Sequence, residues 1–310
     1  MKKVFIDGAQ GTTGLRIHDR LMERNDIELI RLPEELRKDP GAVGEALNQS
    51  DIAFLCLPDD AAREAVGMLN NDNTVILDTS TAHRTAPGWA YGFPELSPEH
   101  RAAIQSSHRI AVPGCHASGF IALVYPLIKA GVLKPDAELS CFSLTGYSGG
   151  GRKMIAQYEA PDRSVLLDAP RQYGLTQQHK HLKEMVAVSG IASAPAFCPI
   201  VSDFYAGMEV TVPLFPSSLL KKVSIADIVE IYKENYPGGI VSVCQENDEA
   251  GFLSAGALSG KDSMVLSVYG QEERMLLVAR YDNLGKGASG AAVQCMNLVL
   301  GTDEDTGLVL

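Results

Sequence analysis

The chain opens with a strand, a glycine-rich turn and a helix, and this succession limits its fold more than any other part of the sequence. Residues 2–24, KKVFIDGAQGTTGLRIHDRLMER, place an apolar run before three glycines and a helix-forming run after them. Residues 26–32, DIELIRL, then supply a second strand. Two short apolar runs separated by a glycine turn and an amphipathic helix predict a βαβ unit with parallel strands.

Three further apolar runs continue this parallel sheet. They are bounded by polar residues or proline, and the helical run at 59–70 lies between the first two: DIAFLCLP (51–58), NTVILDTS (73–80) and RIAVPG (109–114). Short, nearly uninterrupted apolar strands are typical of a parallel sheet that is covered on both faces. We therefore expect an α/β, Rossmann-type dinucleotide-binding domain over residues 1–115.

After about residue 130 the pattern changes to longer β-rich stretches with polar interruptions, at 137–153, 197–214, 264–270 and 274–283. One evident helix, 224–236, links them, and Ser224 is its expected N-cap. This predicts an α+β catalytic and dimerisation domain over 116–284 with a mainly antiparallel sheet. The final apolar helix needs a sheet face to cover, so residues 285–310 are expected to complete the first domain.

Composition excludes several classes of protein. No apolar stretch has the length of a membrane span, and the apolar run after the two N-terminal lysines ends at Asp7, so we expect neither a membrane segment nor a secretory signal but a cytoplasmic protein. A formal net charge of −11 argues against a nucleic-acid partner. The six cysteines include no CxxC pair, so neither disulfides nor a structural zinc are expected.

Gly8, Gly11 and Gly14 stand three residues apart between the first strand and the first helix. Such glycines allow a tight turn and a close backbone approach to a pyrophosphate, and the helix N-terminus offers unpaired N–H groups to it. The spacing G-x-x-G-x-x-G is a variant of the commoner dinucleotide fingerprint.

The end of the second strand bears on which dinucleotide is bound. NAD sites usually carry an acidic residue there, to hold the ribose 2′-hydroxyl. This strand ends near Arg31, whose guanidinium suits a 2′-phosphate, which favours NADP. Glu34 and Glu35 follow shortly, and either could instead meet the ribose.

Cys115 follows a predicted strand and opens the helix ASGFIALVYPLIKAG, with Pro113 and Gly114 forming the turn before it. At a helix N-terminus the free N–H groups stabilise a thiolate. The other five cysteines lack this setting and are expected to pack in the core. A thiolate beside a nicotinamide-binding domain can form an acyl-enzyme that hydride reduces to an aldehyde, which is acyl-phosphate reduction.

That chemistry needs a proton shuttle, and YGLTQQHKHLKEM (173–185) offers His179 and His181 with two lysines nearby. We expect His116 to point away from the sulfur. The remaining histidines are expected to be surface or capping groups: His18, His83, His100 and His108. No carboxylate or thiolate completes a metal-ligand spacing with His116, His179 and His181, so no metal is expected.

The stretch GYSGGGRKM (146–154) supplies flexible backbone followed by Arg152 and Lys153. These cations could bind a carboxylate or phosphate through charge-assisted hydrogen bonds. A solvated hairpin turn is the alternative.

Together these motifs resemble the N-acetyl-gamma-glutamyl-phosphate reductase family in its short form, over nearly the whole chain. The segments that carry the resemblance are the nucleotide loop, the Pro-Gly-Cys signature, the glycine-rich substrate loop, the tyrosine-to-histidine segment and the returning cofactor-side helix: 8–21, 111–127, 148–153, 173–181 and 282–297. Relatives that act on aspartyl phosphate typically have Asn where this chain has Gly114. Longer members commonly read Cys-Tyr-Ala-Thr where this chain reads CHAS (115–118). The detailed substrate contacts near the sulfur therefore do not carry over from the longer members.

The resemblance implies NADPH-dependent reduction of N-acetyl-L-glutamyl 5-phosphate to the semialdehyde through a thioester on Cys115, with His179 as acid/base. His181 is a possible substitute or a substrate contact. The same resemblance implies further substrate contacts at Ser148, Gly149 and Arg152. It implies cofactor contacts at Gly8, Gly11, Thr12, Thr13, Gly14, Arg31, Asn283 and Gly287.

Three other functions fit parts of the sequence. A sister reductase would take aminoadipyl or aspartyl phosphate, and sequence separates these substrates poorly. A redox-sensing NADP-binding protein would leave the histidine segment and the basic loop without a role, and a cysteine hydrolase would have no use for the glycine loop. A homodimer or homotetramer is expected because a β-rich second domain exposes much sheet surface.

Overall fold

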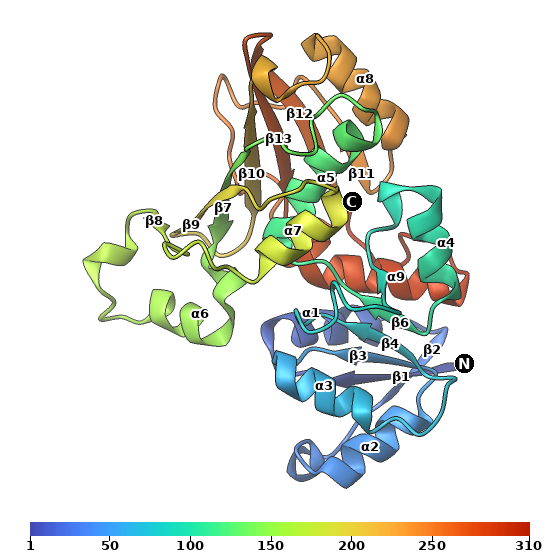
Figure 1. The fold of residues 1–310 in the computed structure, drawn as a ribbon. Coiled ribbons are helices and arrows are strands. Elements are labelled where there is room, and N and C mark those ends of the chain that lie inside the picture. The colour runs from blue at the N-terminus through green and yellow to red at the C-terminus, as the bar shows by residue number, and fades with distance from the viewer. The chain divides into compact units, whose positions relative to one another are not determined.

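The computed structural model describes all 310 residues, which form two compact units (Figure 1). The first unit comprises Met1–Pro94, Pro98–Gly114 and Ala288–Leu308, and the second comprises Glu95–Ser97, Cys115–Gly287 and Val309–Leu310. No helix combines the length and the apolar character that crossing a membrane requires.

The first unit is built on a six-stranded sheet in the order β2-β1-β3-β4-β6-β5, with every neighbouring pair parallel. This confirms the predicted parallel sheet, to which the structure adds the two-residue strand β5. The strands are β1 (Lys2–Asp7), β2 (Ile27–Ile30), β3 (Ile52–Leu55), β4 (Val75–Asp78), β5 (Ala90–Tyr91) and β6 (Arg109–Ala111).

Helices cover both faces of this sheet (Figure 1). They are α1 (Thr12–Met22), α2 (Pro40–Gln49), α3 (Asp59–Gly67), α4 (Pro98–Ser106) and α9 (Gly290–Leu300), with short turns η1 (Glu34–Leu36) and η2 (Pro94–Leu96). Successive side chains of a strand point to opposite faces. Val4 and Ile6 accordingly join the apolar cluster under α1 and α9, while Phe5 joins the cluster under α2 and α3.

The second unit contains a seven-stranded mixed sheet in the order β11-β12-β13-β10-β7-β9-β8. Only β11–β12 and β7–β9 are parallel pairs, so the prediction of a mainly antiparallel sheet is confirmed. The strands are β7 (Ser140–Gly146), β8 (Arg171–Gln172), β9 (Ala196–Ser202), β10 (Met208–Leu214), β11 (Val241–Val243), β12 (Met264–Gln271) and β13 (Arg274–Tyr281).

The predicted helix at 224–236 is present as α8 (Ile225–Asn235), and Ser224 caps it in a capping box with Asp227. Two further helices, which the sequence did not make evident, are α6 (Gly151–Glu159) and α7 (His181–Ser189). The other helical segments are α5 (Cys115–Lys129), the π-helical turn η6 (Gly285–Ser289), and the short turns η3 (Tyr147–Gly150), η4 (Val165–Leu167) and η5 (Pro216–Ser218).

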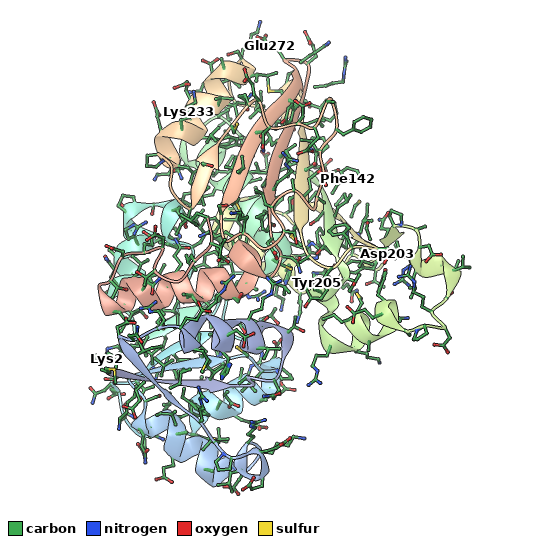
Figure 2. All side chains as sticks on the ribbon, turned by 180° about the vertical axis from the view of Figure 1, so that it is seen from behind. Lys2, Phe142, Asp203, Tyr205, Lys233 and Glu272 are labelled. Carbon is green, nitrogen blue, oxygen red and sulfur yellow. The ribbon has the colours of Figure 1, made fainter.

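The two faces of this sheet differ. Helix α5 packs on β10 and β13, and α8 packs on β12. Along β7, Cys141 and Ser143 are buried, whereas the alternate residue Phe142 is 41% exposed (Figure 2). Leu276 of β13 is similarly 40% exposed. One face of the sheet therefore belongs to the core of the unit, and the other presents apolar side chains to solvent.

Helix α5 is almost entirely buried, although it contains Pro126. A proline inside a helix has no N–H for the carbonyl four residues earlier, here that of Ala122. The hydroxyl of the buried Tyr236 donates to the Ala122 carbonyl oxygen at 2.9 Å, and that of Tyr232 donates to Leu123 at 2.7 Å. Tyr236 thus supplies the donor that Pro126 lacks, and Tyr232 adds a bond to the next carbonyl of the helix.

We expect Tyr236→Phe to lower the free energy of unfolding by about 1–3 kcal/mol, because the Ala122 carbonyl would be left buried without a partner. The measurement is urea denaturation of the variant and of the wild type. In a Pro126→Ala background the cost should be smaller, because the new N–H at 126 can take over the bond. An equal cost in both backgrounds would contradict this explanation.

Candidate active site

The glycine turn between β1 and α1 is as tight as its spacing predicts. Gly8 has φ +79°, and a Cβ there would lie 2.3 Å from the carbonyl oxygen of Cys56. A Cβ on Gly14 would lie 2.3 Å from the Gly8 carbonyl oxygen, and the Gly11 amide donates to the same oxygen at 2.9 Å. Side chains at the first and third glycines would break this turn.

The start of α1 has unused hydrogen-bonding capacity. Its N-cap, Gly11, provides no side-chain cap for the first-turn N–H groups. The hydroxyl oxygen of Thr12 is buried and has no hydrogen-bond partner. A helix N-terminus with a buried unpaired hydroxyl is suited to the oxygens of a phosphate group.

A cavity of about 470 Å³ adjoins this turn. Two of the predicted cofactor residues, Gly8 and Arg31, line it, as do the alternatives Glu34 and Glu35. Three further charged residues also line it, and they are Asp7, Arg37 and Lys38. His18, which follows Gly14 by one helical turn and whose side chain is 31% exposed, lies on the same cavity.

These features fit a nicotinamide dinucleotide. The glycine turn allows the close approach of a pyrophosphate, and Thr12 and the first turn of α1 offer it donors. The apolar wall from β1 and β2 and the cations of the cavity would surround the adenosine part. Thr13 follows Thr12, the first residue of α1, and belongs to the same N-terminal turn.

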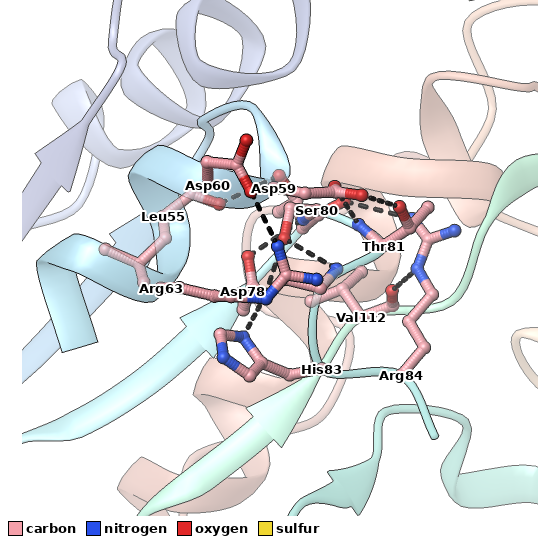
Figure 3. A network of polar contacts seen from close by, with 12 residues as sticks. Leu55, Asp59, Asp60, Arg63, Asp78, Ser80, Thr81, His83, Arg84 and Val112 are labelled. Carbon is pink, nitrogen blue, oxygen red and sulfur yellow. Dashed lines mark hydrogen bonds and ion pairs between the residues drawn. The ribbon is translucent and has the colours of Figure 1, made fainter. Parts of the chain in front are cut away.

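A polar network follows the carboxyl end of β4 and corrects the prediction for His83 (Figure 3). Asp78 is fully buried and accepts hydrogen bonds from the Ser80 amide at 2.9 Å and the Ser80 hydroxyl at 2.8 Å. His83 Nδ1 lies 2.6 Å from the same carboxylate, and its ring stacks on Trp89 at 4.0 Å. His83 is thus a fixed part of the loop, not a surface or capping group.

Arg84 extends the network to the segment before Cys115. Its Nε donates to the Val112 carbonyl at 2.9 Å and its Nη2 to the Thr79 carbonyl at 3.0 Å (Figure 3). The loop after β4 is thereby tied to a residue three positions before the cysteine.

Cys115 is the first residue of α5 and is partly exposed. Gly287 packs directly against it, because a Cβ on Gly287 would lie 3.1 Å from the Cys115 Cβ. Two of the other cysteines have the opposite setting, since burial raises the pKa of the Cys56 thiol to about 12 and also raises that of Cys141. Of these three thiols, only Cys115 occupies the N-terminus of a helix, where a thiolate is stabilised.

His116 is buried between two hydroxyl groups. Its Nδ1 lies 2.6 Å from the Ser143 hydroxyl and its Nε2 lies 2.7 Å from the Tyr173 hydroxyl. Burial, with a smaller effect from the charge of His179, lowers the pKa of His116 to about 3. His116 is therefore a neutral imidazole at physiological pH, and it holds Tyr173 in place.

His179 and His181 come together with His116 but differ from each other. The ring centroids of His179 and His181 are 4.8 Å apart, and each lies within 6 Å of that of His116. His181 begins α7 and is buried, whereas His179 precedes the helix and is partly exposed. The Nδ1 of His179 accepts the His181 backbone N–H at 3.3 Å, so its neutral ring carries the proton on Nε2. No group of His, Cys, Asp or Glu side chains is arranged to hold a metal ion.

The glycine-rich loop after β7 is not a hairpin turn, since it leads through η3 into α6. Ser148 is buried, and its hydroxyl accepts from the Asn283 side-chain amide at 3.0 Å. Asn283 in turn accepts from the Gly207 amide at 2.9 Å, and a Cβ on Gly149 would lie 3.5 Å from the Asn283 amide nitrogen. One network thus joins residues predicted as substrate contacts to one predicted as a cofactor contact. Arg152 lies exposed in the first turn of α6.

The segment after β13 contains two buried charges that the sequence did not reveal. The Asp282 carboxylate accepts from the amides of Leu284 and Gly260 at 2.6 and 2.5 Å, which fixes the turn into η6. Lys286 is 2% exposed, and its Nζ lies 2.7 Å from the Glu95 carboxylate. The only feature of the sequence that points to Asp282 and Lys286 is the closely spaced pair Gly285 and Gly287, which indicates a tightly packed turn.

Comparisons with known proteins agree with this geometry. Residues 115–283 match the family model described as the semialdehyde dehydrogenase dimerisation domain, and residues 33–104 match the semialdehyde dehydrogenase NAD-binding domain. N-acetyl-gamma-glutamyl-phosphate reductase 2 of a Nostoc species is 45% identical over 99% of both chains. N-acetyl-gamma-glutamyl-phosphate reductase of Brucella ovis is 47% identical over 96% of this chain and 99% of its own.

Solved structures share the fold at low sequence identity. Aspartate semialdehyde dehydrogenase II of Vibrio cholerae superposes with a TM-score of 0.72 at 14% identity, over 97% of this chain and 98% of its own. Aspartate semialdehyde dehydrogenase of Candida albicans, solved with NADP, has a TM-score of 0.70 at 15% identity over 99% of both chains.

The resemblance drawn from the sequence is thereby confirmed, and so is the predicted α/β fold class with a nicotinamide dinucleotide as cofactor. The chain belongs to the N-acetyl-gamma-glutamyl-phosphate reductase family of semialdehyde dehydrogenases and is an oxidoreductase of that family.

Proposed function

We propose that the chain reduces N-acetyl-L-glutamyl 5-phosphate to N-acetyl-L-glutamate 5-semialdehyde with NADPH, in the cytoplasm. The names of the full-length relatives support the substrate. The observation that carries the chemistry is the partly exposed cysteine at the start of α5, in the same unit as the histidine pair. The first unit binds the cofactor and the second performs catalysis.

Cys115 is the nucleophile. Its thiolate attacks the acyl carbon, a carbon–sulfur bond forms, and the bond from that carbon to the phosphate oxygen breaks, so that inorganic phosphate leaves. The charge of Cys115 also acts on the Tyr173 phenol, whose pKa is raised mainly by burial. Tyr173 is bonded to His116, whose ring packs 5.8 Å from that of His179. Tyr173, His116 and the proposed proton shuttle are thus in contact with one another, within the electrostatic reach of the sulfur.

When bound, the dinucleotide supplies the hydride that reduces the thioester carbon. His179 donates the proton on Nε2 to the oxygen on that carbon as negative charge develops there. It takes the proton back when the carbon–sulfur bond breaks, which releases the aldehyde and the Cys115 thiolate. Its partial exposure and its fixed Nδ1 favour His179 over the buried His181, which we assign to substrate binding.

The remaining sites follow from position and charge. Arg152 would hold the substrate carboxylate, supported by the loop of Ser148 and Gly149. Arg31 would meet the 2′-phosphate of NADP in the charged cavity. The other proposed cofactor contacts are Gly8, Gly11, Thr12, Thr13, Gly14, Asn283 and Gly287.

We also propose that two copies associate as a homodimer through the open face of the seven-stranded sheet. Residues 115–283 match a dimerisation domain, and this face exposes Phe142 (Figure 2). It also exposes Leu276. Burying such apolar side chains against a second copy would remove them from water.

Cys115→Ser should abolish turnover while leaving NADPH binding intact, because a serine hydroxyl is not ionised by a helix N-terminus. The assay is phosphate-dependent reduction of NADP with N-acetylglutamate semialdehyde and, in parallel, aspartate semialdehyde, and NADPH binding is followed by fluorescence titration. Cys244→Ser, at an exposed cysteine, is the matched control and should keep full activity. Turnover by Cys115→Ser, or preference for the aspartate compound, would refute the proposal.

His179→Asn should lower kcat by about 10²- to 10⁴-fold and remove a limb of the pH–rate profile near neutrality, because the proton shuttle is lost. His181→Asn should cost less in kcat. A full pH series for both variants makes the comparison. A dominant loss in His181→Asn, with His179→Asn near normal, would exchange the two roles.

Arg31→Asp should raise KM for NADP by about 10- to 100-fold and change KM for NAD little, because a charge-assisted bond to the 2′-phosphate is replaced by repulsion. Arg63→Asp, which changes an exposed arginine outside this cavity, is the control and should leave both KM values unchanged. Equal effects of Arg31→Asp on both cofactors would show that another residue discriminates between them.

A further inference from the structure

Three buried tyrosines donate hydroxyl hydrogen bonds to backbone carbonyls of α5, and one of them reaches the residue that begins the helix. Tyr232 and Tyr236 serve carbonyls in the middle of α5. Tyr281, the last residue of β13, donates to the carbonyl oxygen of Cys115 at 2.5 Å. The backbone of the proposed nucleophile is therefore held by a side chain from another element.

The same hydroxyl makes a second bond on this turn. The amide of Gly119 donates to the Tyr281 oxygen at 3.0 Å. In an α-helix the carbonyl of residue 115 and the amide of residue 119 are the pair that the i to i+4 pattern joins. Tyr281 thus touches both members of this pair at the start of α5, and it fixes the orientation of that turn.

The neighbouring residues leave this arrangement little freedom. A Cβ on Gly119 would lie 2.7 Å from the Tyr281 hydroxyl oxygen and equally close to Val210, so a glycine is needed for the ring to reach the helix. On another side, a Cβ on Gly287 would lie 3.1 Å from the Cβ of Cys115. The carbonyl and the Cβ of the cysteine are both closely packed.

We propose that Tyr281 is a positioning residue for Cys115. By bonding to the Cys115 carbonyl, Tyr281 fixes the first peptide of α5 and thereby directs the sulfur toward the acyl carbon of the substrate. The inference rests on the proposed role of Cys115 as the nucleophile. Because the direction of the Cα–Cβ bond follows from the backbone, a small rotation of this peptide would displace the sulfur. Misplacing a reacting group by about 1 Å can cost about 10²-fold in rate.

The charged and titratable groups around the hydroxyl keep it a donor. Burial raises the pKa of Tyr281 well above its usual value, and the negative charge of Cys115 acts in the same direction. The hydrogen bond from the Gly119 amide lowers the pKa, and Cys141 and Glu184 add smaller effects that raise it. On another side of the site, the Tyr173 phenol also senses the charge of Cys115. Tyr281 therefore stays protonated while Cys115 ionises.

The test is Tyr281→Phe, with Tyr232→Phe as the matched control. Both remove one buried hydroxyl that serves α5, but only Tyr281 contacts the cysteine turn. We expect kcat of Tyr281→Phe to fall by about 10- to 100-fold while KM for the semialdehyde and for NADP changes less than about twofold. Tyr232→Phe should lower the unfolding temperature without changing kcat.

A second measurement does not depend on turnover. Alkylation of Cys115 by iodoacetamide is followed against pH by mass spectrometry of its peptide, which separates it from the other five cysteines. In Tyr281→Phe the pH midpoint should rise by about half a unit to one unit, because the sulfur loses its alignment with the helix N-terminus. In Tyr232→Phe it should not move.

The outcomes separate this inference from the proposed function. Wild-type kcat and an unchanged alkylation midpoint in folded Tyr281→Phe would overturn it, and so would equal losses in Tyr232→Phe. In either case Cys115→Ser would still be inactive. If Cys115→Ser instead retains turnover, the proposed function itself has failed.

Discussion

Burying a long apolar helix creates the constraint on which the second unit depends. Helix α5 offers its side chains to the sheet on one side, and its own carbonyls must all find donors away from water. Pro126 removes one donor from within the helix. Three phenols from other elements donate to carbonyls of α5: Tyr232 lies in α8, Tyr236 is the residue that ends α8, and Tyr281 is the last residue of β13. The helix that carries Cys115 is thereby fixed by neighbouring elements along its length.

Patterns that depend on local chemistry were predictable. The glycines of the first turn require the close backbone approach that the structure shows, and the uninterrupted apolar run of β1 is buried on both faces of its sheet, as the sequence predicts. Ser224 is a helix cap because its hydroxyl acts on an amide only three residues away. Helices α6 and α7 were not predicted, because α6 follows a run of glycines and α7 begins within the polar segment of the two histidines, and both patterns suggest a loop.

Features that depend on distant parts of the chain could not be predicted. His83, expected to be a surface or capping group, is held by Asp78 and by stacking on Trp89 across a loop whose path is not encoded locally. His116 meets Ser143 from a strand that begins 24 residues later. The different burial of His179 and His181 could not be predicted, because the two residues lie symmetrically about Lys180 in the sequence.

The pairing of Pro126 with Tyr236 also has an evolutionary consequence. The proline takes a donor away from Ala122, and the tyrosine, 110 positions later, supplies one. If Pro126 is replaced first, a hydroxyl at position 236 is no longer required. If the hydroxyl of Tyr236 is lost first, the buried carbonyl of Ala122 has no hydrogen-bond donor. Positions 126 and 236 should therefore covary among homologues, and the order of the two replacements is constrained.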